Sequence, residues 1–252
     1  MENQFQIIQN GVGTLPIFPS SPETKRNPFV EANSIEVELS HLQKDCIIPV
    51  FAKDNERTIS HQEFIDSSLE AVSQVIQGHH FENPEIRVSH QIKGRTPDAI
   101  HKPAKDLLDH EKTIYYERMA FLVRIPSLFD TIGGNELELS FGGVRSYSLE
   151  NLYQKKGKEK FKFFIGFQNK VCCNLCVSTD GFKDEILAFN TQELKKNISS
   201  LVEGYQAEKE LRKMESLTEF HLTESQFAQI VGKCRMYQYL PKERKNDILL
   251  CC

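Results

Sequence analysis

Residues 114–144, IYYERMAFLVRIPSLFDTIGGNELELSFGGV, carry the clearest strand pattern in the chain. We expect a long strand from Ile114 to Ile125 and a partner strand from Leu137 to Val144, because both runs are rich in aromatic and aliphatic residues. The Gly133-Gly134-Asn135 turn between them is typical of the tight turn that closes a hairpin. This stretch therefore predicts an antiparallel sheet.

Two other stretches extend the predicted sheet. Phe161–Gln168 and Val171–Ser178 form a second expected hairpin around Asn169-Lys170. Upstream, Glu85–Gly94 alternates between apolar and polar residues, as a half-buried strand does. We expect this stretch to be a single strand.

Two capping boxes mark the starts of helices. Ser60 pairs with Glu63, and Thr223 pairs with Gln226, in the spacing by which side chains satisfy the first amide groups of a helix. The first of these helices is expected to end near Gly78. Residues 99–108 and 191–215 are also predicted to be helical.

The pattern as a whole predicts an α+β protein: an antiparallel sheet with flanking helices and a C-terminal helical segment. Residues 1–34 are rich in proline and glycine and are expected to be an extended or disordered leader. We expect an α+β core over residues 35–190 and the helical segment over residues 191–252.

Composition excludes several classes of protein. The chain has 252 residues, of which 39% are hydrophobic, so disorder over the whole length is excluded. No apolar run approaches the length of about 18–20 residues that a helix needs to cross a bilayer, so no membrane association is expected. The N-terminus lacks the pattern of a signal peptide, and we expect a cytoplasmic protein. The net charge of −4 gives no global attraction to nucleic acid.

Seven cysteines are present, and three of them cluster in Cys172-Cys173-Asn174-Leu175-Cys176. The odd number and the missing export signal argue against a disulfide framework. Zinc is one interpretation of the cluster, but no second Cys-x-x-Cys pair supplies four ligands. On a strand, Cys173 and Cys176 would also point to opposite faces. Buried structural cysteines are the favoured interpretation, and no cofactor or metal is expected.

A run of lysines is the first candidate binding site. It lies next to a phenylalanine-rich strand and contains Lys155, Lys156, Lys158, Lys160 and Lys162. Lysines beside aromatic rings are typical of proteins that bind single-stranded nucleic acid. Strand parity puts Phe161, Phe163, Ile165 and Phe167 on one continuously apolar face. The rings are therefore expected in the core, with the lysines as a solvated face around a loop. Phosphate contact by these lysines is the alternative interpretation.

Further cations lie between the two predicted strands of the middle region, and Arg95, Lys102 and Lys105 are the candidates for additional phosphate contacts. His90, Asp98 and His101 lie among them and raise the alternative of a metal enzyme. No recognised spacing of metal ligands, paired carboxylates or a serine nucleophile supports that alternative. No catalytic residue is assigned.

Several blocks of the chain resemble a bacterial family catalogued as domain of unknown function 3871. They are Asn27–Asn33, Asp45–Val50, Ile59–Phe64, Arg87–Arg95, Ala99–Ala104, Ile114–Met119, Gly142–Arg145, Phe164–Phe167 and Val171–Asn174. The family is distantly similar to an uncharacterised phage/plasmid-like family. The resemblance implies a bacterial, cytoplasmic setting in conjugative or prophage elements, without an activity to carry over. It also implies that relatives continue beyond Ile248, so we expect a shortened C-terminus here.

Two functions remain open after these observations. The first is a non-enzymatic accessory protein of a mobile element that binds the backbone of DNA or RNA through the lysines. The second is a protein-interaction module that acts on host or element proteins, which the overall acidity and the core placement of the phenylalanines favour.

Overall fold

The computed structural model describes Phe29 and residues 33–46, 58–99, 101–147, 157–169, 175–176, 185–236 and 239–241. The chain divides into two compact units, Met1–Glu210 and Leu211–Cys252. Most of the expected leader, Lys155, Lys156 and the residues Cys172–Asn174 lie outside the described residues. The expected domain boundaries at residues 34 and 190 stay a prediction.

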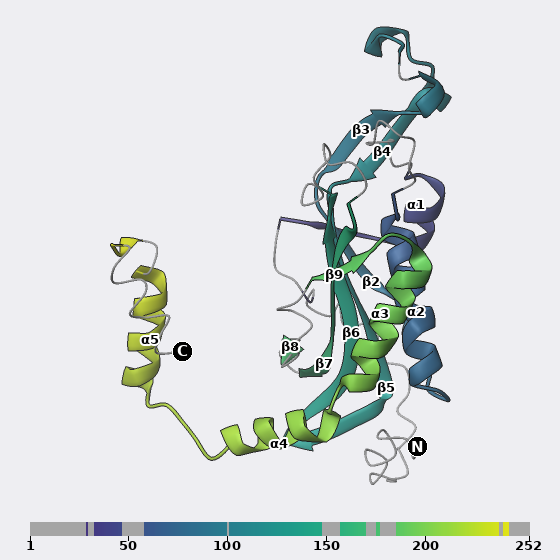
Figure 1. Cartoon of the computed structure of the whole chain (residues 1–252). Coiled ribbons are helices and arrows are strands. Elements are labelled where there is room, and N and C mark those ends of the chain that lie inside the picture. Colours follow the sequence, from purple (N-terminus) through teal and green to yellow (C-terminus); the bar gives the residue numbers. More distant parts are fainter. Residues whose placement is uncertain are drawn as a thin grey trace, which may run out of the picture. The chain divides into compact units, whose positions relative to one another are not determined.

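The first unit is built on an antiparallel sheet flanked by helices, which confirms the predicted α+β class (Figure 1). Its strands lie in the order β1-β2-β5-β6-β7-β8, and β9 also pairs with β7. The strands are β1 (Ile35–Val37), β2 (Glu85–Val88), β5 (Arg118–Ile132), β6 (Asn135–Ser146), β7 (Glu159–Asn169), β8 (Leu175–Cys176) and β9 (Ile186–Ala188).

The predicted hairpin over residues 114–144 is confirmed as the β5–β6 pair. Ile132 pairs with Asn135, so Gly133 and Gly134 form the two-residue turn with φ of 57° and 78°. Positive φ at both turn positions is the geometry that matches the twist of the strands, and glycine adopts it without steric cost. The second predicted hairpin has a different register: Gln168 pairs with Leu175, so a tight turn at Asn169-Lys170 is wrong.

Helix α2 (His61–Val75) packs on one face of the sheet, and the capping box that predicted its start is present. The amide of Glu63 donates to the Ser60 hydroxyl at 3.0 Å, and the amide of Ser60 donates to the Glu63 carboxylate at 2.8 Å. Phe64 is fully buried, with its ring edge-on to Phe121 at a centroid distance of 5.3 Å. The helix ends three residues before Gly78, whose φ is +78°.

Glycine lets this helix approach the sheet closely. A Cβ atom on Gly143 of β6 would lie 2.4 Å from the Phe64 ring, inside van der Waals contact. Helix α3 (Thr191–Gly204) runs beside α2 (Figure 1) and buries Leu194, Ile198 and Val202. Its neighbour α4 (Ala207–Leu217) follows after a break, so the predicted helix over residues 191–215 is two helices.

Two predicted strands are each divided in the structure, and the division creates a separate ribbon. Glu85–Gly94 becomes β2 and β3 (Gln91–Arg95), while Ile114–Ile125 becomes β4 (Lys112–Tyr116) and part of β5. Strands β3 and β4 pair only with each other among the described strands. At the division, the amide of Ser89 donates to the Arg118 carbonyl at 3.0 Å. We call Gln91–Tyr116 the β3–β4 arm.

The arm leaves one end of the main sheet (Figure 1). Its connection contains short 3-10 turns at Pro97–Ala99, Ala104–Asp106 and Asp109–Glu111 instead of the helix predicted over residues 99–108. Helix α1 (Leu39–Lys44) lies near its base, where Cys46 forms a β-bridge with Ile114. No helix in the described part of the chain is long and apolar enough to span a bilayer.

The second unit contains helix α5 (Glu224–Met236), which begins at the predicted capping box. The amide of Thr223 donates to the Gln226 side chain at 2.9 Å, and the Gln226 amide donates back to the Thr223 hydroxyl at 3.3 Å. None of the described residues of α5 is buried. The large apolar side chains Phe227 and Ile230 are therefore exposed, with Phe227 60% accessible.

Candidate functional site

The lysines at the start of β7 are Lys158, just before the strand, and Lys160 and Lys162 within it, and two of the three have acidic partners. Phe161 and Phe163 are buried on the helix-covered face, so Lys160 and Lys162 point to the other face. The ammonium of Lys160 lies 3.0 Å from Glu185. Lys162 forms no ion pair with any residue that the structure describes.

Lys158 is the more firmly held of the two paired lysines. Its ammonium lies 2.6 Å from Glu193 and 5.1 Å from the centre of the Phe189 ring. The hydrogen bond from Lys158 holds the pKa of the Glu193 carboxyl below its usual range, so this carboxylate stays charged at neutral pH. A phosphate would have to compete with that carboxylate.

The other predicted cations all lie on the β3–β4 arm. Arg95 donates to the carbonyl of Lys102, and Lys102 forms an ion pair with Glu111. That hydrogen bond from Lys102 lowers the pKa of the Glu111 carboxyl. Lys105 is exposed and has no ion pair among the described residues. The acidic partners of the arm cations and those of Lys158 and Lys160 are different residues. In the described part of the chain, no hydrogen bond or ion pair joins the two groups of cations.

The pairing of the ribbon reveals a cationic face that sequence reasoning missed. Lys93 lies opposite Ile114, and Arg95 lies opposite Lys112. Residues two apart on a strand, and residues directly opposite across a pair, share a face. Lys93, Arg95 and Lys112 therefore occupy one face of the ribbon. Over the whole arm, five basic residues stand against four acidic ones, a net charge of +1 in a chain of net charge −4.

The base of the arm is held by two histidines that both contact Tyr116, the last residue of β4. His41 Nε2 lies 3.0 Å from the Tyr116 hydroxyl, and its Nδ1 lies 2.7 Å from Asp45. From the other side, His61 Nε2 donates to the carbonyl oxygen of Tyr116 at 2.8 Å. Helices α1 and α2 thereby both fix the position at which the arm leaves the sheet.

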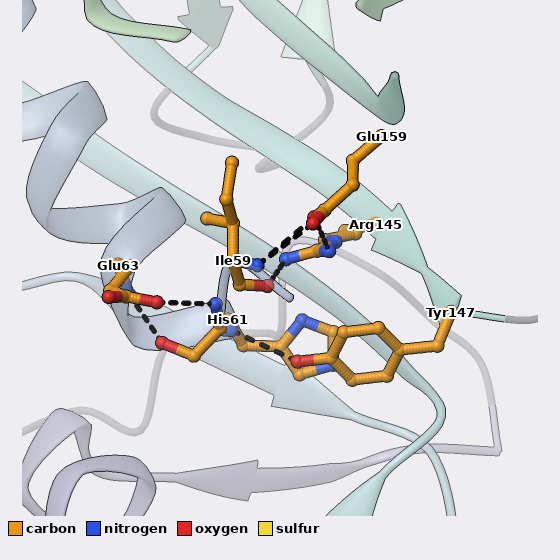
Figure 2. Close-up of polar contacts among 7 residues, drawn as sticks. Ile59, His61, Glu63, Arg145, Tyr147 and Glu159 are labelled. Atoms are coloured by element: carbon orange, nitrogen blue, oxygen red, sulfur yellow. Dashed lines mark hydrogen bonds and ion pairs between the residues drawn. The ribbon is translucent and has the colours of Figure 1, made fainter. Parts of the chain in front are cut away.

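A buried arginine joins this base to the sheet (Figure 2). Arg145 of β6 is fully buried and donates to the Ile59 carbonyl and to the Glu159 carboxylate of β7. Glu159 in turn accepts from the amide of Ile59, with both oxygens at 3.1 Å. The guanidinium also lies 4.6 Å from the centre of the Tyr147 ring, within cation–π range.

His61 completes this cluster as an uncharged group. Its ring stacks on Tyr147 at a centroid distance of 4.3 Å, and its amide donates to the Tyr147 hydroxyl at 3.2 Å. Burial, with a smaller contribution from the nearby Arg145 charge, lowers the pKa of His61 to about 3. Its Nδ1 is buried without a hydrogen-bond partner. Because the ring is enclosed, we interpret the cluster as positioning the arm.

The described residues form no metal site that would support the metal-enzyme alternative. Among the described residues, no three His, Cys, Asp or Glu side chains lie close enough together to hold a metal ion. His90, Asp98 and His101 are exposed along the arm and its connection. Cys46 is half-buried, and burial together with the Asp45 charge raises the pKa of its thiol to about 11, which disfavours a reactive thiolate.

Strand parity was the signal that could have found Arg145. It shares its face of β6 with Phe141 and Gly143, both of which point into the helix-covered core. An arginine at such a position must be paired, because an unpaired buried charge is very costly. The predicted strand ended at Val144, one residue before this position.

Comparison with known proteins places the chain in a family. The model of the family described as "Domain of unknown function, B. Theta Gene description (DUF3871)" matches residues 14–250. Searches of curated proteins and of solved structures returned no match. The matched range includes both the β3–β4 arm and α5. The chain therefore belongs to the family of domain of unknown function 3871.

Proposed function

We propose that this chain is a non-enzymatic accessory protein that binds the phosphate backbone of DNA or RNA through the β3–β4 arm. The observation that carries the proposal is the single ribbon face with Lys93, Arg95 and Lys112. A two-stranded ribbon is narrow enough to enter the major groove of B-DNA. The resemblance of the sequence to conjugative and prophage proteins supports a setting in the bacterial cytoplasm as part of a mobile element.

The arm takes the principal role because it carries two exposed cations, Lys93 and Lys105, without an ion pair among the described residues. Lys112 is paired with the exposed Asp109 and Lys102 with Glu111. Lys158, just before β7, and Lys160 of β7 are also paired with acids. The predicted lysines Lys155, Lys156, Lys158, Lys160 and Lys162 remain in the proposal as secondary contacts, together with Lys102 on the arm. The low net charge of the arm implies few phosphate contacts and therefore weak binding.

Fluorescence anisotropy of the full chain with labelled single- and double-stranded DNA and RNA tests this function. Binding should weaken between about 50 and 200 mM salt, with a slope of about −0.9 per phosphate contact on duplex DNA. In a Lys93→Gln/Arg95→Gln/Lys112→Gln variant, the slope should fall by about 2–3 and the affinity at least about tenfold. Absence of wild-type binding at low salt would overturn the proposal.

Two matched variants locate the contacts. Lys196→Gln/Lys209→Gln/Lys233→Gln removes the same charge from exposed positions outside the arm and should leave binding nearly unchanged. Lys158→Gln/Lys160→Gln/Lys162→Gln should have a smaller effect than the arm variant. If the β7 variant has the larger effect, the arm does not have the principal role. Circular dichroism verifies that each variant is folded.

A protein-interaction module is the second candidate, and exposed apolar residues favour it. Between residues 217 and 239, seven large apolar side chains are exposed: Leu217, Phe220, Leu222, Phe227, Ile230, Met236 and Tyr239. Contiguous exposed apolar surface marks interaction sites. Phe227→Glu/Ile230→Glu separates the two candidates, since it should leave nucleic-acid binding intact and impair a protein contact.

A further inference from the structure

Helix α5 carries an apolar stripe that no described residue covers. Phe227 is 60% exposed and Ile230 is 45% exposed, and no described residue of the helix is buried. At about 100° per residue, Phe227, Ile230, Val231 and Cys234 fall within an arc of about 100°. A helix with such a face needs a partner surface to bury it.

The charges beside the stripe indicate what that partner is. Glu224 and Arg235 fall on the same flank of the stripe, within about 20° of each other around the helix axis. They lie 11 positions apart, or about 16 Å along the axis, at opposite ends of the helix. Neither forms an ion pair with any residue that the structure describes. The helix thus presents opposite charges at its two ends, along one edge of its apolar face.

This arrangement is self-complementary in only one orientation. When two copies pair antiparallel about a two-fold axis, each flank meets the same flank of the other helix with its ends reversed. Glu224 then faces Arg235 of the partner subunit, twice in the dimer. A parallel pair would instead place this flank against the opposite flank, which carries Gln226 near the start of the helix and Lys233 near its end, so no pair of opposite charges would form. Antiparallel packing also opposes the two helix dipoles favourably.

We propose that α5 is a self-association helix that pairs antiparallel with α5 of a second copy of this chain. Phe227 packs between Val231 and Cys234 of the partner subunit, and Ile230 lies next to the two-fold axis. Each end of the interface is closed by a Glu224–Arg235 pair. Two helices of about 20 Å bury a small area, so the dimer forms in the micromolar range.

Sedimentation velocity of the full chain between 1 and 200 μM, a range set around about micromolar affinity, tests self-association. The wild-type protein should change from monomer to dimer across this range. Phe227→Glu/Ile230→Glu should raise the dissociation constant at least about tenfold. Ser225→Glu/Gln229→Glu places the same two charges on the opposite face of α5 and should leave the dimer intact.

Charge exchange tests the antiparallel orientation. Glu224→Arg and Arg235→Glu should each weaken the homodimer, because like charges then face each other at both ends. An equimolar mixture of the two variants should form a heterodimer with two restored pairs, tighter than either variant alone. Circular dichroism of each variant controls for lost helix, since both substitutions oppose the helix dipole.

The outcomes decide the proposal independently of nucleic-acid binding. A wild-type chain that stays monomeric at all concentrations overturns it, and the α5 face then belongs to another protein or to this chain's own first unit. A dimer that is unaffected by the Phe227 and Ile230 substitutions also overturns it. A mixture that is no tighter than its components overturns the antiparallel pairing. The arm variant, which leaves α5 unchanged, should dimerise like the wild type.

Discussion

Helices α2 and α5 both begin with a capping box and carry an apolar stripe, yet their burial is opposite. Phe64 sits four residues after its N-cap Ser60 and is fully buried, whereas Phe227 sits four residues after Thr223 and is 60% exposed. The difference lies in what surrounds each helix. The strands β5–β7 supply an apolar face for α2, and no described residue supplies one for α5.

The comparison teaches that a good local helix signal carries no information about a partner surface. Helix α2 is fixed at its start by long-range contacts: Ile59, just before the helix, is bound by Arg145 and Glu159, and His61 is bound by Tyr116. Among the residues that the structure describes, the side-chain hydrogen bonds of α5 are those of its own capping box. Because α2 is held by these contacts, it can position the arm. Helix α5 has no such contacts with described residues, so its apolar face is available for association.

The largest expected contrast is between two phenylalanine truncations. Phe64→Ala should lower the free energy of unfolding by about 3–5 kcal/mol, because it leaves a cavity against Phe121 and Phe161. Phe227→Ala should change it by less than about 0.5 kcal/mol at protein concentrations below those of dimer formation. Urea unfolding followed by tyrosine near-UV circular dichroism measures both. Equal effects would show that α5 is buried against the first unit.

Replacing Arg145, which binds the residue before the N-cap of α2, should lower the free energy of unfolding by a comparable amount. Arg145→Met leaves the Glu159 carboxylate without its buried partner and should destabilise by about 3–5 kcal/mol. Arg118→Met removes an exposed arginine at the start of the neighbouring strand and should cost less than about 0.5 kcal/mol. The same urea titrations compare the two. A small loss at Arg145 would mean that α2 is held by its apolar face alone.

The buried His61 at the start of α2 should make the stability of the protein depend on pH. The folded-state pKa of His61 is lowered to about 3, so the unfolded chain binds its proton near pH 6.5 while the native ring remains neutral. Stability is therefore complete above pH 6.5 and falls with decreasing pH, by about 2 kcal/mol between pH 6.5 and 5. This contribution should be missing in His61→Gln and retained in His101→Gln, which alters an exposed histidine. Identical pH dependence in wild type and His61→Gln would contradict the buried neutral ring.

The smallest expected effects come from the caps. Ser60→Ala should lower the free energy of unfolding of the first unit by about 1 kcal/mol. Thr223→Ala should cost α5 a similar amount of helix stability without changing the near-UV unfolding transition. Far-UV circular dichroism follows the helix loss in the second variant. A shift of the near-UV transition by Thr223→Ala would reveal coupling between α5 and the sheet.

Much of the fold was predictable because it depends on neighbours in sequence. Both capping boxes, the glycine turn at Gly133-Gly134 and the inward face of Phe161 and Phe163 follow from hydrogen bonds or alternation over a few residues. The candidate site was predictable only in part. Arg95, Lys102 and Lys105 were selected from their charge, but their common arm and its cationic face with Lys93 were not.

The division of two expected strands could not be predicted from alternation. Apolar residues recur at Val88 and Ile92, so the pattern continues across Ser89 and His90, where the chain leaves the main sheet. Tyr116 and Arg118 continue the other strand in the same way. Only the pairing of the two exit points, with Ser89 bound to the Arg118 carbonyl, shows that a ribbon begins there.

The sequence by itself determined the α+β class, the starts of α2 and α5, the glycine turn and the parity of β7, since each depends on the steric and hydrogen-bonding preferences of adjacent residues. The tertiary structure alone decided that the arm leaves the sheet, that Arg145 lies beside His61, and that α2 is enclosed while no described residue buries α5. These features depend on contacts between residues far apart in the chain. Such contacts leave no local pattern in the sequence. A short segment forms the same backbone hydrogen bonds whether or not a distant part of the chain packs against it.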